Sequence, residues 1–262
     1  MELIVCVKRV PDTSEAEIKI GQSGKEIVTD NLAFNMNEAD NYALEEALLI
    51  KEKMGGTVTL ITAGPEAAED ILRMGLAKGA DTAIRIDDPL FAGSDGPAVA
   101  RILAEAVKTL PYDLILTGCM ASDNWDSVVG PAMAELLSIP HAALVTNAEI
   151  QESTCRVQRE LEGGLLAQME IALPALLTIQ TGINEPRYAS IMGIAKASKR
   201  EITIHDAAAL GLGADTVGDK GSGTHVLSLS LPVQEKMAEI LTGSPDEVSA
   251  SLAVILKERG LV

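Results

Sequence analysis

Aromatic residues are scarce in this chain. They make up 2% of its 262 residues, and there is a single tryptophan, Trp125. Trp125 lies in a polar loop, "ASDNWDS", that follows an apolar run. A large planar side chain in such a loop is expected either to cover a ligand or to close the end of a helix.

Cysteine and histidine are also few, and their spacing matches neither a disulfide pattern nor a set of metal ligands. The chain has three of each: Cys6, Cys119, Cys155, His141, His205 and His225. There is no CxxC pair and no ligand spacing between the two residue types, which argues against a disulfide framework and a structural metal. The sequence therefore predicts no metal site.

Positive charge is in deficit, with 21 basic and 38 acidic residues and a formal net charge of -17. Such a surface repels phosphate backbones and anionic lipids, so we expect neither nucleic-acid binding nor membrane insertion. The local exception is Lys196, Lys199 and Arg200. The first apolar run turns charged after seven residues, and no signal peptide is recognisable, so a cytoplasmic location is expected.

The common catalytic motifs are missing as well. The sequence contains no GxGxxG after its first apolar run, no GxxxxGK[ST], no HExxH and no GxSxG. The glycine-rich "GDKGSG" at 218–223 is interpreted as a flexible loop. No histidine forms an evident triad with a serine or cysteine. We therefore predict no catalytic residue, and a chain that binds and positions a ligand.

What the chain does contain is a regular alternation of apolar runs and amphipathic stretches. Apolar runs at 3–8, 57–64, 82–86 and 113–118 alternate with helical patterns at 37–54, 66–78 and 95–109, the first of which Asn37 is expected to cap. Continuous Val/Ile/Leu runs separated by helices are typical of strands buried on both faces. The predicted fold is α/β, with a doubly wound, mostly parallel Rossmann-like sheet.

The second half departs from this rhythm. Residues 154–161 and 165–173 predict an antiparallel hairpin around Gly163-Gly164, and 174–180 a return strand. A helix should begin no earlier than about Val128, since Pro131 suits a first turn. We divide the chain into an α/β nucleotide-binding domain, 1–205, and a C-terminal arm, 206–262, that ends in a helix at about 245–259. An arm too short for its own core implies a partner chain.

The ligand site should lie beyond the carboxyl ends of the strands. Small residues there, including Cys6, Ala63 and Ala121, leave room for a flat ligand. The loop side chains Asp123, Asn124 and Ser127 could contact a ribose or adenine, and the start of the next helix suits a phosphate. The loop is therefore either an adenine-nucleotide cradle or an ordinary polar βα loop with a capping serine.

One longer pattern separates these alternatives. The stretch "INEPRYASIMGIAKASKREI" at 183–202 resembles the recognition-loop signature of the β subunit of electron transfer flavoproteins, N-E-P-R-Y followed by K-A-x-K. The stretches "VCVKRVPDT" (5–13), "NMNEADNYALEEALLIKEK" (35–53), "TAGP" (62–65), "LAKGAD" (76–81) and "VQRELEGGL" (157–165) follow in the family's order. The resemblance covers nearly the whole chain.

The resemblance implies a heterodimer with an α subunit that carries FAD and is wrapped by the C-terminal arm. It also implies an adenine-nucleotide α-hydrolase-like fold and a nucleotide pocket, which carries over to Cys6, Asn37, Ala63, Asp95, Ala121, Asp123, Asn124, Ser127, Val128 and Val129. The pocket holds AMP in the housekeeping branch. In the bifurcating branch it holds a second FAD that takes hydride from NADH.

Three features favour the bifurcating branch and therefore FAD: "VPDT" at 10–13, "LFAGSDG" at 90–96, and Val129-Gly130-Pro131. Two positions depart from its pattern. Gly96 stands where that branch has threonine, and Val128 replaces a side-chain amide. AMP in this subunit, within a single-FAD shuttle, remains the alternative.

The same resemblance implies a docking loop for an acyl-CoA dehydrogenase or another dehydrogenase. Its residues here are Glu185, Tyr188, Ile191, Met192 and Lys196, within a recognition loop at 183–200. Ile191 and Met192 would form an apolar tip, with nearby cations for orientation.

Two other classes of protein share the fold pattern. A stand-alone, ATP-binding protein of the universal-stress type would form a homodimer without flavin. An ATP-hydrolysing or adenylating enzyme would need a phosphate loop after the first strand, and "KRVPDTSE" offers none. In the favoured interpretation the chain is an electron-carrier subunit, and it oxidises NADH only with a second FAD and the α subunit.

Overall fold

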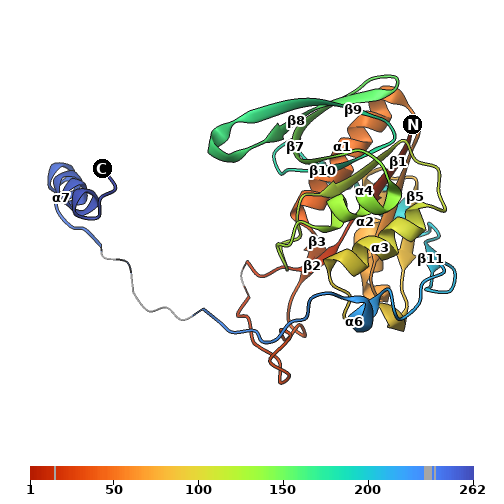
Figure 1. The fold of residues 1–262 in the computed structure, drawn as a ribbon, viewed down its shortest axis with the longest axis horizontal. Helices are drawn as coiled ribbons and strands as arrows, with labels where there is room; N and C mark the ends of the chain where they lie inside the picture. The colour runs from red at the N-terminus through yellow and green to blue at the C-terminus, as the bar shows by residue number, and fades with distance from the viewer. Residues whose placement is uncertain (15, 233–237, 239) are drawn as a thin grey trace.

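The computed structural model describes all residues except 15, 233–237 and 239, and in the described chain one large mixed sheet forms the centre (Figure 1). Its strands lie side by side in the order β11 (Thr203–His205), β5 (Thr82–Ile86), β4 (Thr57–Ala63), β1 (Glu2–Cys6), β6 (Leu114–Gly118), β10 (Ala175–Ile179), β7 (His141–Ile150), β8 (Thr154–Glu160) and β9 (Leu166–Ala172). From β11 to β7 all neighbours are parallel, and β7, β8 and β9 are antiparallel. The predicted fold class is confirmed.

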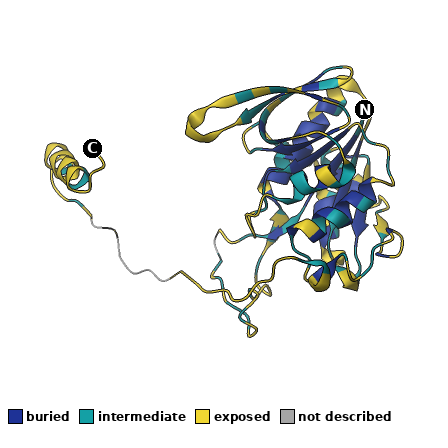
Figure 2. Ribbon diagram, in the orientation of Figure 1, coloured by how far each residue is buried: buried dark blue, intermediate teal, exposed yellow. Residues whose placement is uncertain are grey.

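Helices cover both faces of the parallel part, as a doubly wound fold requires. The main helices are α1 (Glu38–Met54), α2 (Glu69–Lys78), α3 (Gly96–Val107) and α4 (Val129–Leu137). Leu3 and Val5 of β1 pack with α1 and α2, whereas Ile4 and Cys6 pack with α3 and α4. This alternation follows from the two-residue period of a strand. The sheet is consequently buried between two helical layers (Figure 2).

The order of the strands creates a switch point in the middle of the sheet. After β1 the chain places β4 and β5 to one side, and after α3 it places β6 on the other side of β1. The crossover loops that leave β1 and β6 therefore diverge at their carboxyl ends. In open α/β sheets, this is where ligands bind.

Five elements were not foreseen from the sequence: β7, β11, α5 (Ile191–Ala197), β2 (Arg9–Pro11) and β3 (Phe34–Met36). β7 carries a register irregularity between Val145 and Asn147 and a positive φ at Leu144, so its hydrophobic alternation is broken. β11 has only three residues, and α5 interrupts the expected loop. A small separate sheet pairs β2 with β3.

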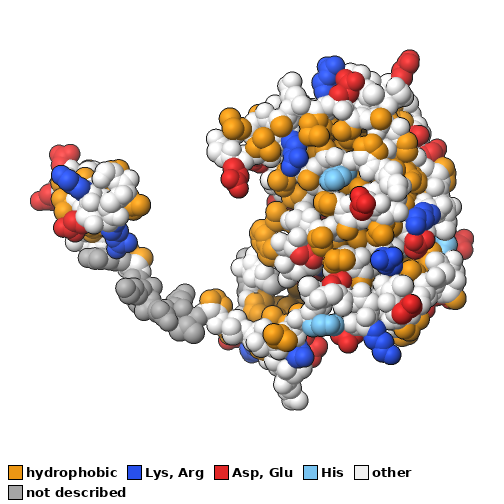
Figure 3. Space-filling model, in the orientation of Figure 1, with side chains coloured by type: hydrophobic (Ala, Val, Ile, Leu, Met, Phe, Trp, Pro, Cys, Tyr) orange, Lys and Arg blue, Asp and Glu red, His pale blue; other side chains and the backbone are white. Residues whose placement is uncertain are grey.

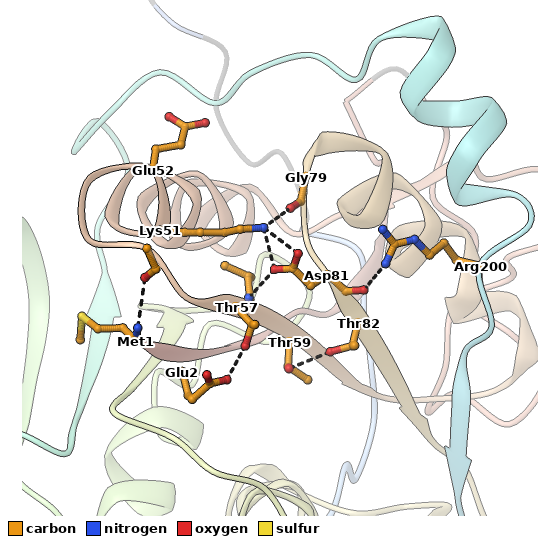
Figure 4. A network of polar contacts seen from close by, with 12 residues as sticks. Met1, Glu2, Lys51, Glu52, Thr57, Thr59, Gly79, Asp81, Thr82 and Arg200 are labelled. Atoms are coloured by element: carbon orange, nitrogen blue, oxygen red, sulfur yellow. Dashed lines mark hydrogen bonds and ion pairs between the residues drawn. The ribbon is translucent and has the colours of Figure 1, made fainter.

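A polar network fastens the opposite, amino end of the strands (Figure 4). Lys51 near the end of α1 donates to the Asp81 carboxylate at 2.6 and 2.7 Å and to Gly79 O at 3.1 Å. The same carboxylate accepts from Val58 N at 2.8 Å, and Arg200 donates to Asp81 O. The turn at 79–81, between α2 and β5, thus joins α1, β4 and the segment after α5.

The first part of the C-terminal segment lies against the α/β body. Leu210 and Val217 are buried in the core cluster that includes residues of α3 and α4. The short helix α6 (Gly218–Gly221) contains part of "GDKGSG", so the flexible-loop interpretation of 218–223 is wrong. Its backbone is held because Gly218 N donates to Ser94 Oγ and Asp219 N to Ala92 O.

The last helix, α7 (Pro245–Glu258), confirms the expected terminal helix. It starts with a capping box between Ser244 and Glu247, and none of its residues is buried. It lies apart from the body in Figure 1, and Figure 3 shows hydrophobic side chains exposed on it. Across the described residues, no helix is long and apolar enough to cross a membrane.

Candidate functional site

A cavity of about 960 Å³ lies at the switch point between β1 and β6. Its sides come from the residues after β1, β4 and β6, from the loop before α3, from the first turn of α4, and from residues 219–226. The volume is at the upper end of the range of small-molecule sites. The cavity therefore sits where the strand order predicts a ligand.

Asp40, in the first turn of α1, holds the two central strands together at the floor of this cavity. Its carboxylate accepts from Lys8 N at 2.7 Å and from Gly118 N at 3.0 Å, so one side chain joins the ends of β1 and β6. A Cβ at Gly118 would overlap Asp40 Oδ1 and would lie 2.8 Å from Ala39 Cβ. Glycine is therefore required for α1 to approach β6 this closely.

Asn37 was expected to cap α1, and the structure corrects this. It occupies the N-cap position but makes no side-chain capping bond. Instead its Nδ2 donates to Met120 O at 2.9 Å and its Oδ1 accepts from Ser122 N at 3.1 Å. Asn37 is 2% exposed. It thus lies beneath the loop after β6 and fixes that loop's position.

Burial controls the protonation of the groups at the cavity floor. Desolvation raises the pKa of Asp40 from 3.8 to about 7, although its hydrogen bonds oppose the shift. Burial, with a smaller contribution from Asp40, raises the pKa of Cys6 to about 12. Burial also raises the pKa of Cys119. Both thiols are therefore neutral near pH 7 and act as small apolar surfaces rather than nucleophiles.

The loop between β6 and α4 has an unusual backbone. Trp125 and Ser127 both have positive φ, at 56° and 51°, which is uncommon for residues other than glycine and is often found at functional sites. Asp123 is held by Lys8, with Lys8 Nζ 2.6 Å from Asp123 Oδ2. Trp125 is 69% exposed, so it covers neither the cavity nor a helix end in this chain alone.

The first turn of α4 faces the cavity without a side-chain cap. Val128 at the N-cap position makes no capping bond, and Val129 and Gly130 line the cavity. The first N–H groups of a helix have no intrahelical partner, and together with the helix dipole they favour an anion. This part of the cavity suits a phosphate group.

The two departures from the bifurcating pattern are in contact with each other. A Cβ at Gly96 would overlap Val128 Cγ1 and would lie 2.6 Å from Asp126 Oδ2. The valine therefore occupies the space that a larger residue at 96 would need. The two positions are matched to one another, which no single-position comparison could reveal.

The cavity gathers most of the predicted nucleotide-binding residues. Those that line it are Cys6, Ala63, Asp95, Ala121, Asn124, Ser127 and Val129. The other three do not line it: Asn37 is buried under the loop, Asp123 pairs with Lys8 in the exposed loop, and Val128 fills the space beside Gly96. Their binding roles remain predictions.

Several lining residues were missed, notably Lys8, Lys25, Asp40, Thr117, Thr224 and His225. Asp40 carried a signal, because a carboxylate in a first helical turn next to small strand-end residues can reach their backbone N–H groups. Residues 219–226 carried none, since their approach depends on the path of the C-terminal segment. Within the described residues, no cluster of three or more His, Cys, Asp or Glu could hold a metal ion.

The predicted docking residues form a second, separate surface. Its base is held by Arg187, which donates to both Glu45 oxygens at 2.9 and 3.0 Å and to Glu52 Oε1 at 2.6 Å. Asn184 adds bonds to Tyr42 O and Glu46. These contacts fix residues 184–187 on the outer side of α1.

Beyond this base the loop projects apolar side chains into solvent. Tyr188 is 98% exposed, Ile191 87% and Met192 72%. Glu185 and Lys196 are also exposed. Ser190 caps α5, since its Oγ accepts from Gly193 N at 3.0 Å, and a Cβ at Gly193 would overlap Ala77 O. A rigid base and an exposed apolar tip are the features of a protein-binding surface.

A doubly wound sheet with a large cavity at its switch point is the arrangement in which open α/β proteins commonly bind a ligand, at the carboxyl ends of the strands. Comparison with known proteins makes this more specific. The family described as electron transfer flavoprotein domain matches residues 25–210. The β subunit of electron transfer flavoprotein from Thermoanaerobacterium thermosaccharolyticum is 39% identical over 100% of both chains.

Two further relatives agree. The corresponding β subunit of Methylophilus methylotrophus is 36% identical over 98% of both chains. A subunit named CarD of the caffeyl-CoA reductase-Etf complex of Acetobacterium woodii is 36% identical over 100% of both. The chain therefore belongs to the electron transfer flavoprotein β-subunit family, whose members take part in electron transfer.

The raised pKa of Asp40 predicts a pH-dependent contribution to stability. Between pH 3.8 and about 7 the folded state holds a proton that the unfolded state releases, so the free energy of unfolding falls as pH rises through this window. At about 1.4 kcal/mol per pKa unit, the effect is roughly 4 kcal/mol. Asp40→Asn should remove it. Urea unfolding of both proteins from pH 4.5 to 8 measures the difference, and a difference that is constant with pH would contradict this account.

The contact between Gly96 and Val128 predicts strong coupling in a double-mutant cycle. Gly96→Thr alone should destabilise by about 1–3 kcal/mol through overpacking. In the Val128→Ala background, the destabilisation caused by Gly96→Thr should be at least about 1 kcal/mol smaller, because the shorter side chain at 128 leaves room for the threonine. In the Val254→Ala background, which changes a distant residue of α7, the destabilisation should be the same as in the wild type. Equal costs of Gly96→Thr in both backgrounds, measured by urea unfolding, would show that the two sites do not interact.

Proposed function

We propose that this chain binds an adenine nucleotide, with FAD favoured, in the cavity between β1 and β6, and works with an α subunit to pass electrons from a dehydrogenase to an acceptor. The observation that carries the proposal is the position and build of the cavity. It lies at the switch point, its floor is fixed by Asp40, and an uncapped helix start opens into it.

The residues present fit such a ligand. Gly118, Ala63 and Ala121 leave flat apolar space against the strand ends, where an aromatic ring can approach the backbone. Ser127 and Asn124 supply polar atoms for a ribose or adenine edge. The first turn of α4 supplies N–H groups for phosphate.

The size of the cavity favours FAD over AMP. About 960 Å³ exceeds what a mononucleotide fills, and the lining extends from Cys6 at the strand ends to Lys25 and Val226. An elongated dinucleotide uses that length. AMP as a structural ligand is the alternative, and it would leave the outer part of the cavity to solvent.

The chain's own contribution is to hold and shield the ligand. FAD, when bound, supplies the redox chemistry, including hydride acceptance if NADH is the donor. The protein residues orient the ligand and exclude water, and the buried thiols near it stay neutral. No side chain in the cavity is assigned a catalytic step.

The partners follow from the exposed surfaces. α7 has apolar residues and buries none of them in this chain, which is expected of an arm that packs on an α subunit. The loop that carries Tyr188, Ile191 and Met192 would dock a dehydrogenase. A stand-alone, ATP-binding protein of the universal-stress type would have no use for either surface.

The nucleotide content of the purified complex tests the proposal. We expect the chain, co-expressed with its α subunit, to release two FAD and no AMP per heterodimer on denaturation, as quantified by chromatography. One FAD and one AMP would support the single-flavin alternative instead. A complex with no nucleotide beyond that of the α subunit would contradict nucleotide binding here.

Docking is tested separately by Ile191→Asp. A buried charge without a partner is costly at an interface, so electron transfer to or from the dehydrogenase should fall by at least about tenfold. Flavin content should stay the same. Ile204→Asp changes another exposed isoleucine outside the loop and should have little effect. Loss of flavin in Ile191→Asp, or equal loss of activity in both variants, would refute the docking role.

A further inference from the structure

The segment at residues 218–229, here called the C-terminal strap, is hydrogen-bonded to the loop that precedes α3. Ser222 is central to this contact. Its Oγ accepts from Asp95 N at 2.8 Å and lies 2.7 Å from Gly218 O and 3.1 Å from Gly93 O. The strap and the loop at 92–96 therefore form one unit, although they are more than 120 residues apart in the sequence.

The Asp95 carboxylate accepts three of the hydrogen bonds that join the strap to this loop. Its Oδ1 accepts from Ala98 N at 3.0 Å and so caps α3. Its Oδ2 accepts from Gly223 N at 2.8 Å, from Thr224 N at 3.0 Å and from Thr224 Oγ1 at 3.1 Å. An ionised carboxylate offers about four lone-pair sites. Three of the four donors within the protein reach Oδ2, so the oxygen that bonds the strap is saturated.

The residues that Asp95 holds are also part of the cavity. Thr224, His225 and Val226 line it, as does Lys25 from the loop at 21–27. Leu229 N donates to Gly24 O at 2.7 Å, so the strap is attached at its other end to that same loop. The strap thus forms the outer side of the cavity and is fixed at two points.

We infer that Asp95 is a positioning residue that does not bind the nucleotide itself: it holds the C-terminal strap in place as the outer side of the nucleotide pocket, and so couples nucleotide binding to the attachment of the C-terminal segment. The inference revises the role expected for Asp95 from the sequence. It rests on the proposed function, since it concerns the same pocket.

The physical reason for the coupling is that the strap has two states. When Asp95 holds it, the cavity has an outer side and a ligand contacts Thr224 to Val226. When it is released, those contacts are lost. A ligand that binds only the closed state must stabilise it, and by reciprocity the closed strap must increase ligand affinity. The strap leads on toward α7, so the ordered arm and the filled pocket favour each other.

The test uses the full heterodimer and compares Asp95→Asn with a matched control. The substituted amide keeps the shape of the carboxylate but has one acceptor oxygen, and its own hydrogens would face the Gly223 and Thr224 N–H groups. Asp88→Asn is the control. Asp88 also accepts two backbone bonds, from Leu90 N and Ala207 N, but it is outside the set of residues that line the cavity.

Two quantities are measured: the rate of nucleotide dissociation, and hydrogen exchange in peptides from 218–229 with and without nucleotide. In the wild type, nucleotide should slow exchange in the strap. Asp95→Asn should speed strap exchange, abolish its dependence on nucleotide, and raise the dissociation rate by about tenfold or more, as expected for lost charge-assisted bonds. Thr224→Ala and Ser222→Ala leave the α3 cap intact and should give smaller changes in the same direction. Asp88→Asn should change neither quantity.

Four outcomes would overturn the inference. Faster dissociation in Asp95→Asn with unchanged strap exchange would make Asp95 a direct ligand contact. Faster strap exchange with unchanged dissociation would show that the strap is not part of the pocket. If Asp95→Asn fails to fold, the Thr224→Ala and Ser222→Ala variants decide the question. The inference is refuted if both variants keep the dissociation rate and the strap exchange of the wild type. A wild-type complex with no nucleotide in this subunit would refute the proposed function and the coupling, while strap exchange would still decide whether Asp95 holds the strap.

Discussion

The structure depends on one buried carboxylate. Asp40 accepts backbone N–H bonds from the ends of both β1 and β6, at the point where the chain changes direction across the sheet. Without an acceptor there, two backbone donors would be left unpaired beside the cavity, at a cost of about 1–3 kcal/mol each. The bond to Gly118 also sets how closely α1 approaches β6. The floor of the cavity is thus fixed before any ligand arrives.

The same helix supports both the cavity and the proposed docking surface. At its start, Asn37 and Asp40 hold the loop after β6 and the strand ends. Two to four turns later, Glu45 and Glu52 hold Arg187, and with it the base of the docking loop. A rigid helix between the pocket and the loop keeps their separation constant. If a dehydrogenase docks at the loop and a flavin fills the cavity, as proposed, electron transfer between them would depend on this fixed separation, because distance controls its rate.

Much of this could be predicted from sequence, and the exceptions have physical causes. The buried strands and the amphipathic helices had clear periodicities, so the doubly wound core was recognisable, and the position of the pocket followed from strand order. The irregular β7 and the three-residue β11 left no readable period. Asn37 and Asp95 were expected in the pocket region, but the partners they bond are 83 to 129 residues away in the chain, at Met120, Ser122, Gly223 and Thr224. Such long-range bonds cannot be inferred from local spacing.

The most direct test of the account is a crystal structure of the complex with the α subunit. The account predicts an adenine nucleotide between the ends of β1 and β6, with its phosphates at the first turn of α4 and the Asp40 carboxylate still bonded to Lys8 N and Gly118 N beneath it. Density for a nucleotide only in the α subunit, with water alone in this cavity, would contradict it.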